Sequence, residues 1–339
     1  MTVPRIGPLS AVVHRRQVLV PVVALAALLL VSAVSLGRGD FPIPLGDVLA
    51  TLVGLGGPAQ AFVVLELRAP RIVVGALVGL ALGLAGALFQ TFARNPLASP
   101  DVLGITQGAS AGAVAAIVLG GGLLTVPIAT LAGALLTGAL LVALTWRAGI
   151  DGYRLVLIGI AVWAAAAAVV DWLLTRAEIH DAAAAYVWIT GSLNARGWEH
   201  AAPLAISLAV LVPLALAAGR VLAVLQFGDD IARGLGVRMA AAQGAVVLIA
   251  VGCVAGAVAA AGPVGFVALV VPQIAVRLTA GSRPPLLASG LLGAVLVVGA
   301  DLAARSLLPQ ALPVGILTAG IGAPYLLWLL VRGRRRATL

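Results

Sequence analysis

Apolar runs of about 20 residues recur along the whole chain, and they constrain its fold more than any other feature. Of the 339 residues, 62% are hydrophobic and 10% are charged, and the mean hydropathy is +1.15. A soluble globule of this size would need many more polar residues to cover its surface. A helix that crosses the hydrocarbon core needs roughly 20 residues at about 1.5 Å each. The sequence therefore predicts an all-α polytopic membrane protein.

The apolar runs predict about ten transmembrane helices within a transmembrane domain at residues 18–331. A tail at 1–17 precedes this domain, and a basic tail at 332–339 follows it. Spans almost touch near residues 120–125 and 260–264, so counts of nine and eleven are also compatible with the pattern. The ten spans are 18–37, 70–92, 102–121, 124–145, 154–175, 201–219, 241–261, 264–280, 286–307 and 313–331.

The basic residues predict the orientation of these spans. All 21 are arginine, and most fall on one side of the membrane when both termini are placed in the cytoplasm. This distribution follows the rule that basic residues near span ends stay inside. The formal net charge of +9 is then a topology signal, and no soluble basic domain remains to bind nucleic acid.

The residue types exclude several kinds of chemistry. Without lysine, the chain cannot form a P-loop ATPase site or a Schiff base. Cys253 is the only cysteine, so an internal disulfide is impossible. His14, His180 and His200 lack the spacing of metal ligands. We therefore predict no catalytic residues, no metal site and no cofactor.

Two acidic residues lie within predicted spans, where a carboxylate often marks an ion or proton path. Asp301 precedes Arg305 by four residues, so the two can form an ion pair on one helix face. Asp171 precedes Arg176 by about one turn. We interpret both acids as members of structural ion pairs.

A polar loop at residues 220–239 separates two predicted spans on the cytoplasmic side. It is expected to contain two short helices that break at Gly228 and Gly236. Asp229 and Asp230 then stand at a helix N-terminus, where negative charge is favoured. The loop is either a docking surface for a cytoplasmic motor or an ordinary solvated connector.

Several motifs resemble the FecCD/BtuC permease family, the membrane subunits of bacterial type II ABC importers for iron-siderophores, haem and cobalamin. The resemblance extends in order from about residue 20 to near the end of the chain. Its motifs are RAPR at 68–71, AGALFQ at 85–90, RNPLASPDVLG at 94–104, GDDIARGLGV at 228–237 and LPVGILTAGIGAPYLLWLL at 312–330. Three further segments are similar to the second permease subunit of ferric-enterobactin importers: SPDVLGITQGA at 99–109, WRAGIDGYRLVLIGIAV at 146–162 and GSLNARGW at 191–198.

The resemblance implies partners on both sides of the membrane. Outside, Arg68, Arg71 and Arg305 would dock an extracytoplasmic substrate-binding protein by gripping carboxylates. The alternative is that Arg68 and Arg71 only anchor a span at the lipid headgroups. Inside, the loop would couple to two ATPase subunits, which the permease itself does not contain. The coupling residues would be Gly228, Asp229, Asp230, Arg233, Gly234 and Gly236. A second permease subunit would complete a heterodimer or a homodimer, with the heterodimer favoured.

The resemblance also implies a pathway through the bundle. A short re-entrant helix at 181–191 would line the outer mouth, although its aromatic residues equally suit a membrane-interface belt. Gln273 departs from the family, where histidine often follows the proline. The pathway and gate candidates are Asn95, Pro96, Leu97, Gly104, Gln107, Gly108, Tyr186 and Trp188.

The expected function is therefore that of a permease in the bacterial plasma membrane. It would move an iron-siderophore complex inward by alternating access that a separate ATPase drives. The same architecture carrying haem or cobalamin is an alternative, as is an ion-coupled secondary transporter. The small number of membrane-buried acids disfavours the secondary transporter.

Overall fold

A computed structural model describes residues 5–6, 9–10, 15–39, 41–122, 125–146, 152–281, 284–306 and 312–334. Most of the expected N-terminal tail and the end of the basic C-terminal tail lie outside these residues. Apart from two antiparallel two-residue strands, β1 (Arg5–Ile6) and β2 (Leu9–Ser10), the elements are helical. They are α1 Arg15–Gly37, α2 Leu45–Leu52, α3 Pro58–Ala61, η1 Phe62–Arg68, α4 Ala69–Phe92, α5 Ile105–Val118, α6 Thr125–Trp146, α7 Gly152–Arg176, α8 Ile179–Ile189, α9 Trp198–Leu225, α10 Asp229–Gly234, α11 Met239–Ala261, α12 Val267–Thr279, α13 Leu286–Ser306 and α14 Val314–Arg334.

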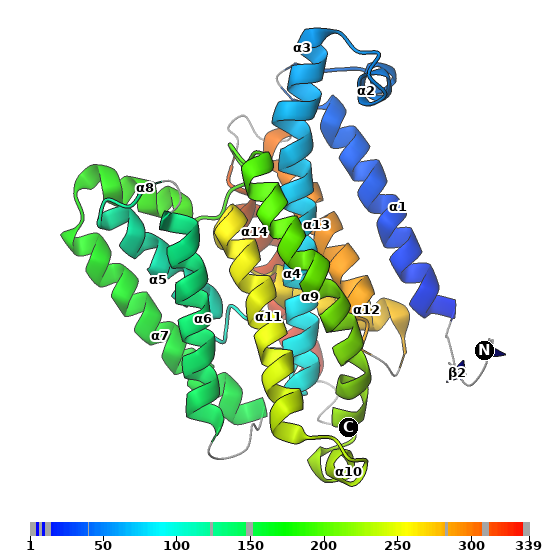
Figure 1. The fold of residues 1–339 in the computed structure, drawn as a ribbon, viewed down its shortest axis with the longest axis vertical. Coiled ribbons are helices and arrows are strands. Elements are labelled where there is room, and N and C mark those ends of the chain that lie inside the picture. The colour runs from blue at the N-terminus through cyan, green and yellow to red at the C-terminus, as the bar shows by residue number, and fades with distance from the viewer. Residues whose placement is uncertain are drawn as a thin grey trace.

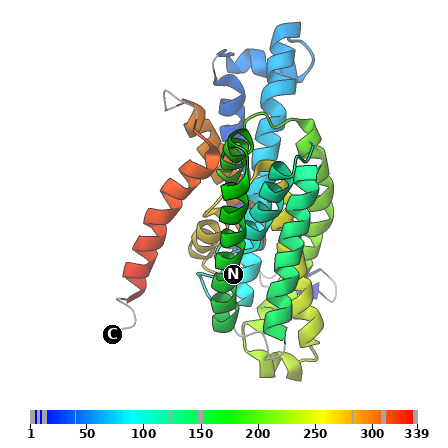
Figure 2. The same cartoon turned by 90° about the vertical axis from the view of Figure 1, so that its left-hand side faces the viewer.

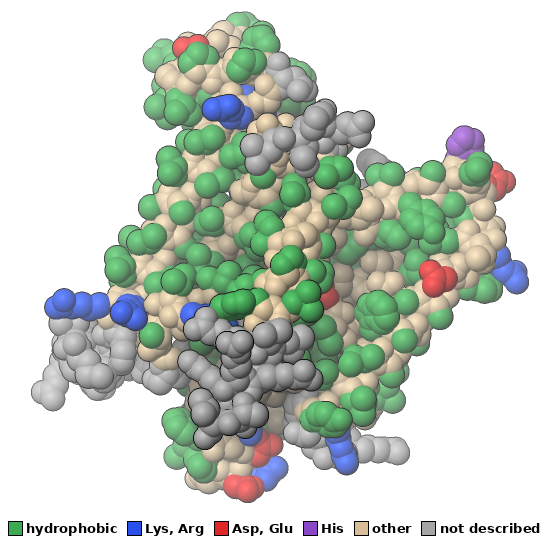
Figure 3. Space-filling model, turned by 180° about the vertical axis from the view of Figure 1, so that it is seen from behind, with side chains coloured by type: hydrophobic (Ala, Val, Ile, Leu, Met, Phe, Trp, Pro, Cys, Tyr) green, Lys and Arg blue, Asp and Glu red, His purple; other side chains and the backbone are tan. Residues whose placement is uncertain are grey.

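The bundle is built around α4, which contacts α9, α11, α12 and α13. Figure 1 shows α4, α9 and α11 running along the long axis of the molecule, with α1 on one flank. A second group, α5 to α8, stands beside the first and joins it mainly where α6 and α5 contact α11. Hydrophobic side chains cover most of the face seen in Figure 3. Lipid is the solvent that suits this surface.

Glycines bring the backbone of α4 against its neighbours. A Cβ atom on Gly79 would overlap the carbonyl oxygen of Gly293 in α13, and one on Gly86 would overlap that of Ala268 in α12. Small residues permit this approach, which supplies packing where lipid removes the hydrophobic drive between helices. The glycine-rich sequence of α4 therefore explains its place at the centre of the bundle.

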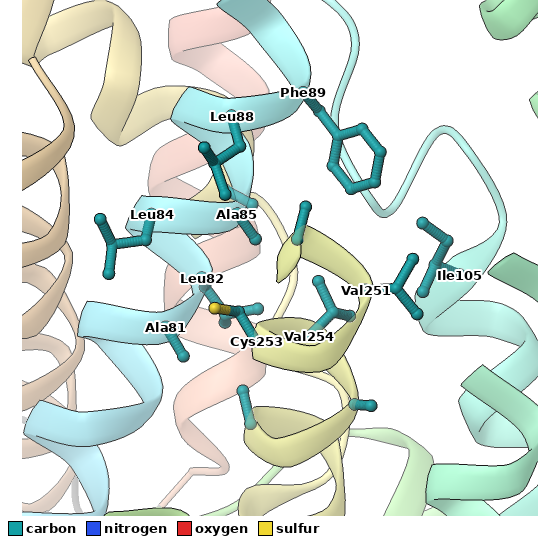
Figure 4. Close-up of a cluster of buried hydrophobic side chains, with 14 of the residues drawn as sticks. Ala81, Leu82, Leu84, Ala85, Leu88, Phe89, Ile105, Val251, Cys253 and Val254 are labelled. Atoms are coloured by element: carbon teal, nitrogen blue, oxygen red, sulfur yellow. The ribbon is translucent and has the colours of Figure 1, made fainter. Parts of the chain in front are cut away.

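Side chains fill the spaces that these close contacts leave. In Figure 4, Leu82, Leu88 and Phe89 of α4 lie among side chains of α5 and α11, including Ile105 and Val254. All five are 2% exposed or less. This cluster holds the two groups of helices together.

The ten predicted spans all fall on helices, and the all-α membrane architecture is confirmed. Seven helices in the described residues are long and apolar enough to cross a membrane. Two spans are shorter than expected, with apolar helices at Ile105–Val118 and Val267–Thr279. Helix α5 begins only at Ile105 because prolines interrupt the preceding segment and Gly104 adopts a φ of 80°. A helix of 14 residues is about 21 Å long and does not cross the hydrocarbon core alone.

Two predicted boundaries were wrong. The second span begins at Pro58, not at residue 70, because α3, η1 and α4 form one continuous helix of 35 residues. The π-helical segment η1 lies just before Pro70, where the ring disrupts regular α-helical hydrogen bonding. The loop at 220–239 contains one separate helix instead of two, because α9 continues to Leu225.

The packing of α4 predicts opposite effects for two glycine substitutions in transmembrane helices. Gly79→Ala should lower the thermal unfolding midpoint in detergent, because overpacking costs about 1–3 kcal/mol. Gly299→Ala is the matched control, since no atom beyond its own stretch of helix lies within 4 Å of the position that its Cβ would occupy. Its midpoint should stay unchanged or rise, because alanine favours helices by about 1 kcal/mol over glycine. Equal midpoints for the two variants would contradict the close contact.

Candidate functional site

Three arginines gather around one aspartate at the end of the bundle where α4 begins. We call Arg68, Arg71, Arg305 and Asp301 the outer arginine cluster, after the side of the membrane that the arginine distribution predicts for this end of the bundle. Arg71 Nε lies 3.2 and 3.1 Å from the two Asp301 carboxylate oxygens, and its Nη2 lies 2.8 Å from Oδ1. Arg305 Nε donates to Asp301 Oδ2 at 3.1 Å. The predicted Asp301–Arg305 pair is confirmed, and Arg71 is a further partner.

The outer arginine cluster also connects segments that are distant in sequence. Arg68 donates to the carbonyl oxygens of Leu36 and Phe41 at 2.7 and 2.6 Å. Arg305 donates to Ser35 Oγ at 2.5 Å. Arg71 donates to Asn194 Oδ1, in the loop after α8, at 3.2 Å. The cluster thereby holds α1, α4, α13 and this loop together.

Burial and charge distinguish this cluster from a simple surface patch. The side chains of Asp301, Arg71 and Arg305 are 3%, 17% and 13% exposed. One carboxylate among three guanidinium groups leaves the cluster with an excess of positive charge. It can therefore attract a further anion, but only at the exposed edges of the arginines.

The expected pair between Asp171 and Arg176 is absent from the ion pairs of the described side chains. Arg176 instead lies over the Trp172 ring, 4.9 Å from its centroid. A spacing of five residues turns about 140° around a helix, which places the two side chains on different faces. A cation–π contact with the adjacent tryptophan replaces the expected pair.

The outer loop at 190–197 and α8 lie near the outer arginine cluster, to which Asn194 connects them. Tyr186 on α8 is exposed, whereas Trp188 packs against the main core. Arg196 Nη1 lies 3.1 Å from His200 Nε2. Burial lowers the pKa of the Arg196 guanidinium, and the nearby Glu199 carboxylate opposes this shift. The structure has a short helix, α8, where one was expected at 181–191. It lies at the same end of the bundle as the outer arginine cluster.

The opposite end of the bundle carries α10, the short helix of the loop at 220–239. It lies between Gly228 and Gly236, whose φ angles of 106° and 82° favour glycine and break the chain at the predicted points. Asp229 pairs with Arg94, at the end of α4, at 2.5 Å. Asp230 pairs with Arg233 within α10 at 2.9 Å. The loop is therefore joined to the turn that directly follows the central helix.

A polar cavity of about 340 Å³ lies beside this junction. Gln273 Nε2 donates to Gln90 Oε1 at 2.6 Å, and Gln90 Nε2 donates to the Leu269 carbonyl oxygen at 2.9 Å. Asn95 and Pro96 also line the cavity. Gln273, at the position where the family that the sequence resembles often has histidine, thus links α12 to α4. Its hydrogen bond to Gln90 needs no ionisable group.

The structure separates the pathway candidates into three places. Asn95, Pro96 and Leu97 form the turn after α4, where Asn95 Oδ1 accepts a hydrogen bond from the Leu97 N–H at 2.9 Å. Tyr186 and Trp188 lie at the outer end on α8. The remaining candidates, Gly104, Gln107 and Gly108, belong to α5 and its N-terminus. Gly104 packs on α7, Gly108 packs on α6, and Gln107 is half-buried.

Asp101 is a partly buried residue whose contacts were not expected from the sequence. Its carboxylate accepts hydrogen bonds from Thr106 Oγ1 at 2.8 Å and from the Phe266 N–H at 3.2 Å. It thereby ties the start of α5 to the start of α12. The sequence does offer one signal for this role: Asp101 follows Pro100 and lies four residues before the start of α5. An apolar cavity of about 420 Å³ adjoins it, with Trp163 and Phe266 among its lining residues.

The described residues offer no ligand set for a metal ion. No group of three or more His, Cys, Asp or Glu side chains among them has metal-binding geometry. The arrangement instead consists of an apolar helical bundle with polar contacts concentrated at its ends. This is the architecture of a polytopic membrane protein.

Comparison with known proteins places this architecture in a family. The model of the FecCD transport family matches residues 26–332, and the chain belongs to this family. The ferric enterobactin transport system permease protein FepG of Escherichia coli is 39% identical over 327 residues, covering 96% of this chain and 99% of FepG. The achromobactin transport system permease protein CbrC of Dickeya dadantii is 40% identical, covering 91% of this chain and 90% of CbrC.

A solved structure confirms the fold. A chain described as belonging to a metal-chelate type ABC transporter, in an inward-facing conformation, superposes with a TM-score of 0.81 at 27% identity. The match covers 93% of this chain and 99% of the solved one. The recognised family and the multi-pass membrane architecture are thus both supported by structure as well as sequence.

The buried ion pairs predict a large difference between two aspartate substitutions. Asp301→Asn should destabilise the protein by about 3–5 kcal/mol, because it leaves buried arginines without their counter-charge. Asp171→Asn, at an exposed position in α7, should change stability by no more than about 0.5 kcal/mol. Thermal unfolding midpoints in detergent would show the difference. An Asp301→Asn midpoint as high as that of the control would contradict the role of the cluster.

Proposed function

We propose that this chain is the permease subunit of an ABC importer that moves an iron-siderophore complex into the cytoplasm. The observation that carries the proposal is the match with FepG over nearly the full length of both chains. The names of CbrC and of the Fe(3+) dicitrate transport system permease protein FecD of Escherichia coli point to the same class of cargo. The chain itself supplies the membrane pathway and has no ATPase site.

The partners follow from the two polar ends. One of the two ATPase subunits of the complex would bind at α10 in the cytoplasm, and a second, distinct permease would complete the pore. The orientation in which both termini are cytoplasmic places α10 on that side, in agreement with the excess of arginine there. The full complex would sit in the bacterial inner membrane.

The central helix offers a mechanical connection between these ends. Movement of α10 would pass to the end of α4 through the Asp229–Arg94 pair. The close backbone contacts of α4 with α12 and α13 would carry that movement into the bundle. Packed helices shift as rigid bodies more readily than they deform, which suits alternating access between outward-open and inward-open states.

At the outer end, the arginine cluster would meet acidic residues of a substrate-binding protein. The cluster carries excess positive charge, and arginine can grip a carboxylate with two parallel hydrogen bonds. Because Arg68, Arg71 and Arg305 already bond within the fold, they would hold the outer end of the bundle in shape while their exposed edges bind the partner. The short helix α8, with Tyr186 and Trp188, would line the mouth below.

The proposed function predicts ATP-dependent uptake by the assembled complex. Liposomes that contain this chain, its partner permease and the ATPase should accumulate labelled ferric siderophore when a loaded binding protein and internal ATP are present. A complex whose ATPase cannot hydrolyse ATP is the control and should not accumulate cargo. Uptake that persists without ATP while an ion gradient is held would indicate a secondary transporter instead. Uptake of haem or cobalamin, but of no siderophore, would reassign the cargo.

The contact between α10 and α4 predicts a charge-swap phenotype. Arg94→Asp and Asp229→Arg should each lower the amount of cargo moved per ATP hydrolysed, because each places like charges together. Stability should barely change, since the side chains are 47% and 38% exposed and such pairs contribute about 0–1 kcal/mol. The double variant should recover much of the lost coupling. Single variants with normal coupling would show that the pair has no part in transmission.

A further inference from the structure

The short helix α2 has three different faces. Val48 and Thr51 point into the protein and are 1% and 2% exposed. Leu45, Leu49 and Leu52 are 51%, 62% and 49% exposed, although they are large and apolar. At 3.6 residues per turn these leucines lie within about 60° of one another, and Asp47 lies roughly opposite them. One face therefore meets protein, one is apolar, and one is polar.

The place of α2 in the fold matches that division. Figures 1 and 2 show α2 lying across the long axis along which the transmembrane helices run. It follows the outer end of α1, where the Ile43 N–H donates to the Gly37 carbonyl oxygen at 3.0 Å. Helix α1 exposes apolar side chains such as Leu29 and Leu30, so lipid is the solvent that suits the side of α1 that faces away from the bundle. Helix α2 thus begins where a lipid-covered surface ends.

We propose that α2 is an interfacial helix that lies on the membrane leaflet opposite the α10 end and inserts Leu45, Leu49 and Leu52 among the lipids. A helix that lies flat beside a bundle has one side toward the protein, one toward the membrane and one toward water. If the leucines faced water, the Asp47 side of the helix would face the lipid, which a carboxylate strongly disfavours. An apolar face in the headgroup region is the arrangement that amphipathic surface helices adopt.

The contact of α2 with lipid would also support the outer arginine cluster. The Phe41 carbonyl oxygen, just before α2, accepts a hydrogen bond from Arg68 Nη2 at 2.6 Å. Ile43 and Val48 pack against Val64 of η1, the segment that ends at Arg68. Lipid contact at α2 would therefore hold the Arg68 segment at a set height above the membrane. The inference needs only the membrane location of the chain and does not rest on the proposed cargo.

Spin labels on single cysteines test the proposal in the full complex reconstituted into liposomes. Cys253 is fully buried, so labelling should be confined to introduced cysteines. Labels at Leu45→Cys, Leu49→Cys and Leu52→Cys should collide more with oxygen, which concentrates in lipid, than with a water-soluble nickel chelate. Asp47→Cys and Ala50→Cys are matched controls on the same helix and should show the reverse order. Leu29→Cys on α1 provides the lipid reference.

Two results would overturn the proposal. One is equal access of the nickel chelate to all five positions of α2. The other is protection of the leucine positions only after a substrate-binding protein is added, which would make this face a protein-docking surface. A second measurement avoids altered residues: the wild-type complex, irradiated in liposomes with a photoactivatable phospholipid, should carry lipid adducts on the peptide that contains residues 45–52. Absence of adducts there, with adducts present on α1, would also refute the inference.

Discussion

The close backbone contact between α4 and its neighbours supports the rest of the structure. In lipid, apolar side chains gain little by leaving their solvent, so helices must associate through packing at short range. Gly79 and Gly293 allow this between α4 and α13, and Gly86 allows it against α12. A larger residue at these points would separate the helices that carry the polar contacts. The contact of Arg71 on α4 with Asp301 on α13 therefore depends on small residues in the middle of these helices.

The central helix also connects two distant polar sites in the fold. Its outer end supplies Arg71 to the arginine cluster, and Arg94, just beyond its inner end, reaches α10. The outer contacts are mostly buried, whereas the inner pair is largely exposed. Buried ion pairs resist rearrangement because separating them leaves an unpaired charge, while exposed pairs exchange with water at little cost. The end of the bundle with the arginine cluster is thus built to hold its shape, and under the proposed function the α10 end is suited to follow a moving partner.

Local patterns were sufficient to predict much of this architecture. The ten apolar segments were recognisable because a lipid-embedded helix needs a long apolar run. The Asp301–Arg305 pair and the breaks at Gly228 and Gly236 depend on neighbours within one or two turns. The start of the second span was missed because Arg68 and Pro70 interrupt the apolar pattern, although η1 and α4 continue the helix across them. The pair of Asp171 with Arg176 was wrong because side chains five residues apart diverge.

The sequence by itself determined the membrane environment, the family and the contacts between residues close along the chain, because composition and helical periodicity act over short distances. Only the tertiary structure decided which remote residues meet. Arg71 and Asp301 are 230 positions apart, Phe266 and Asp101 are 165 apart, and Arg94 and Asp229 are 135 apart. These contacts depend on the register at which helices pack, and that register is set by the summed fit of many small side chains.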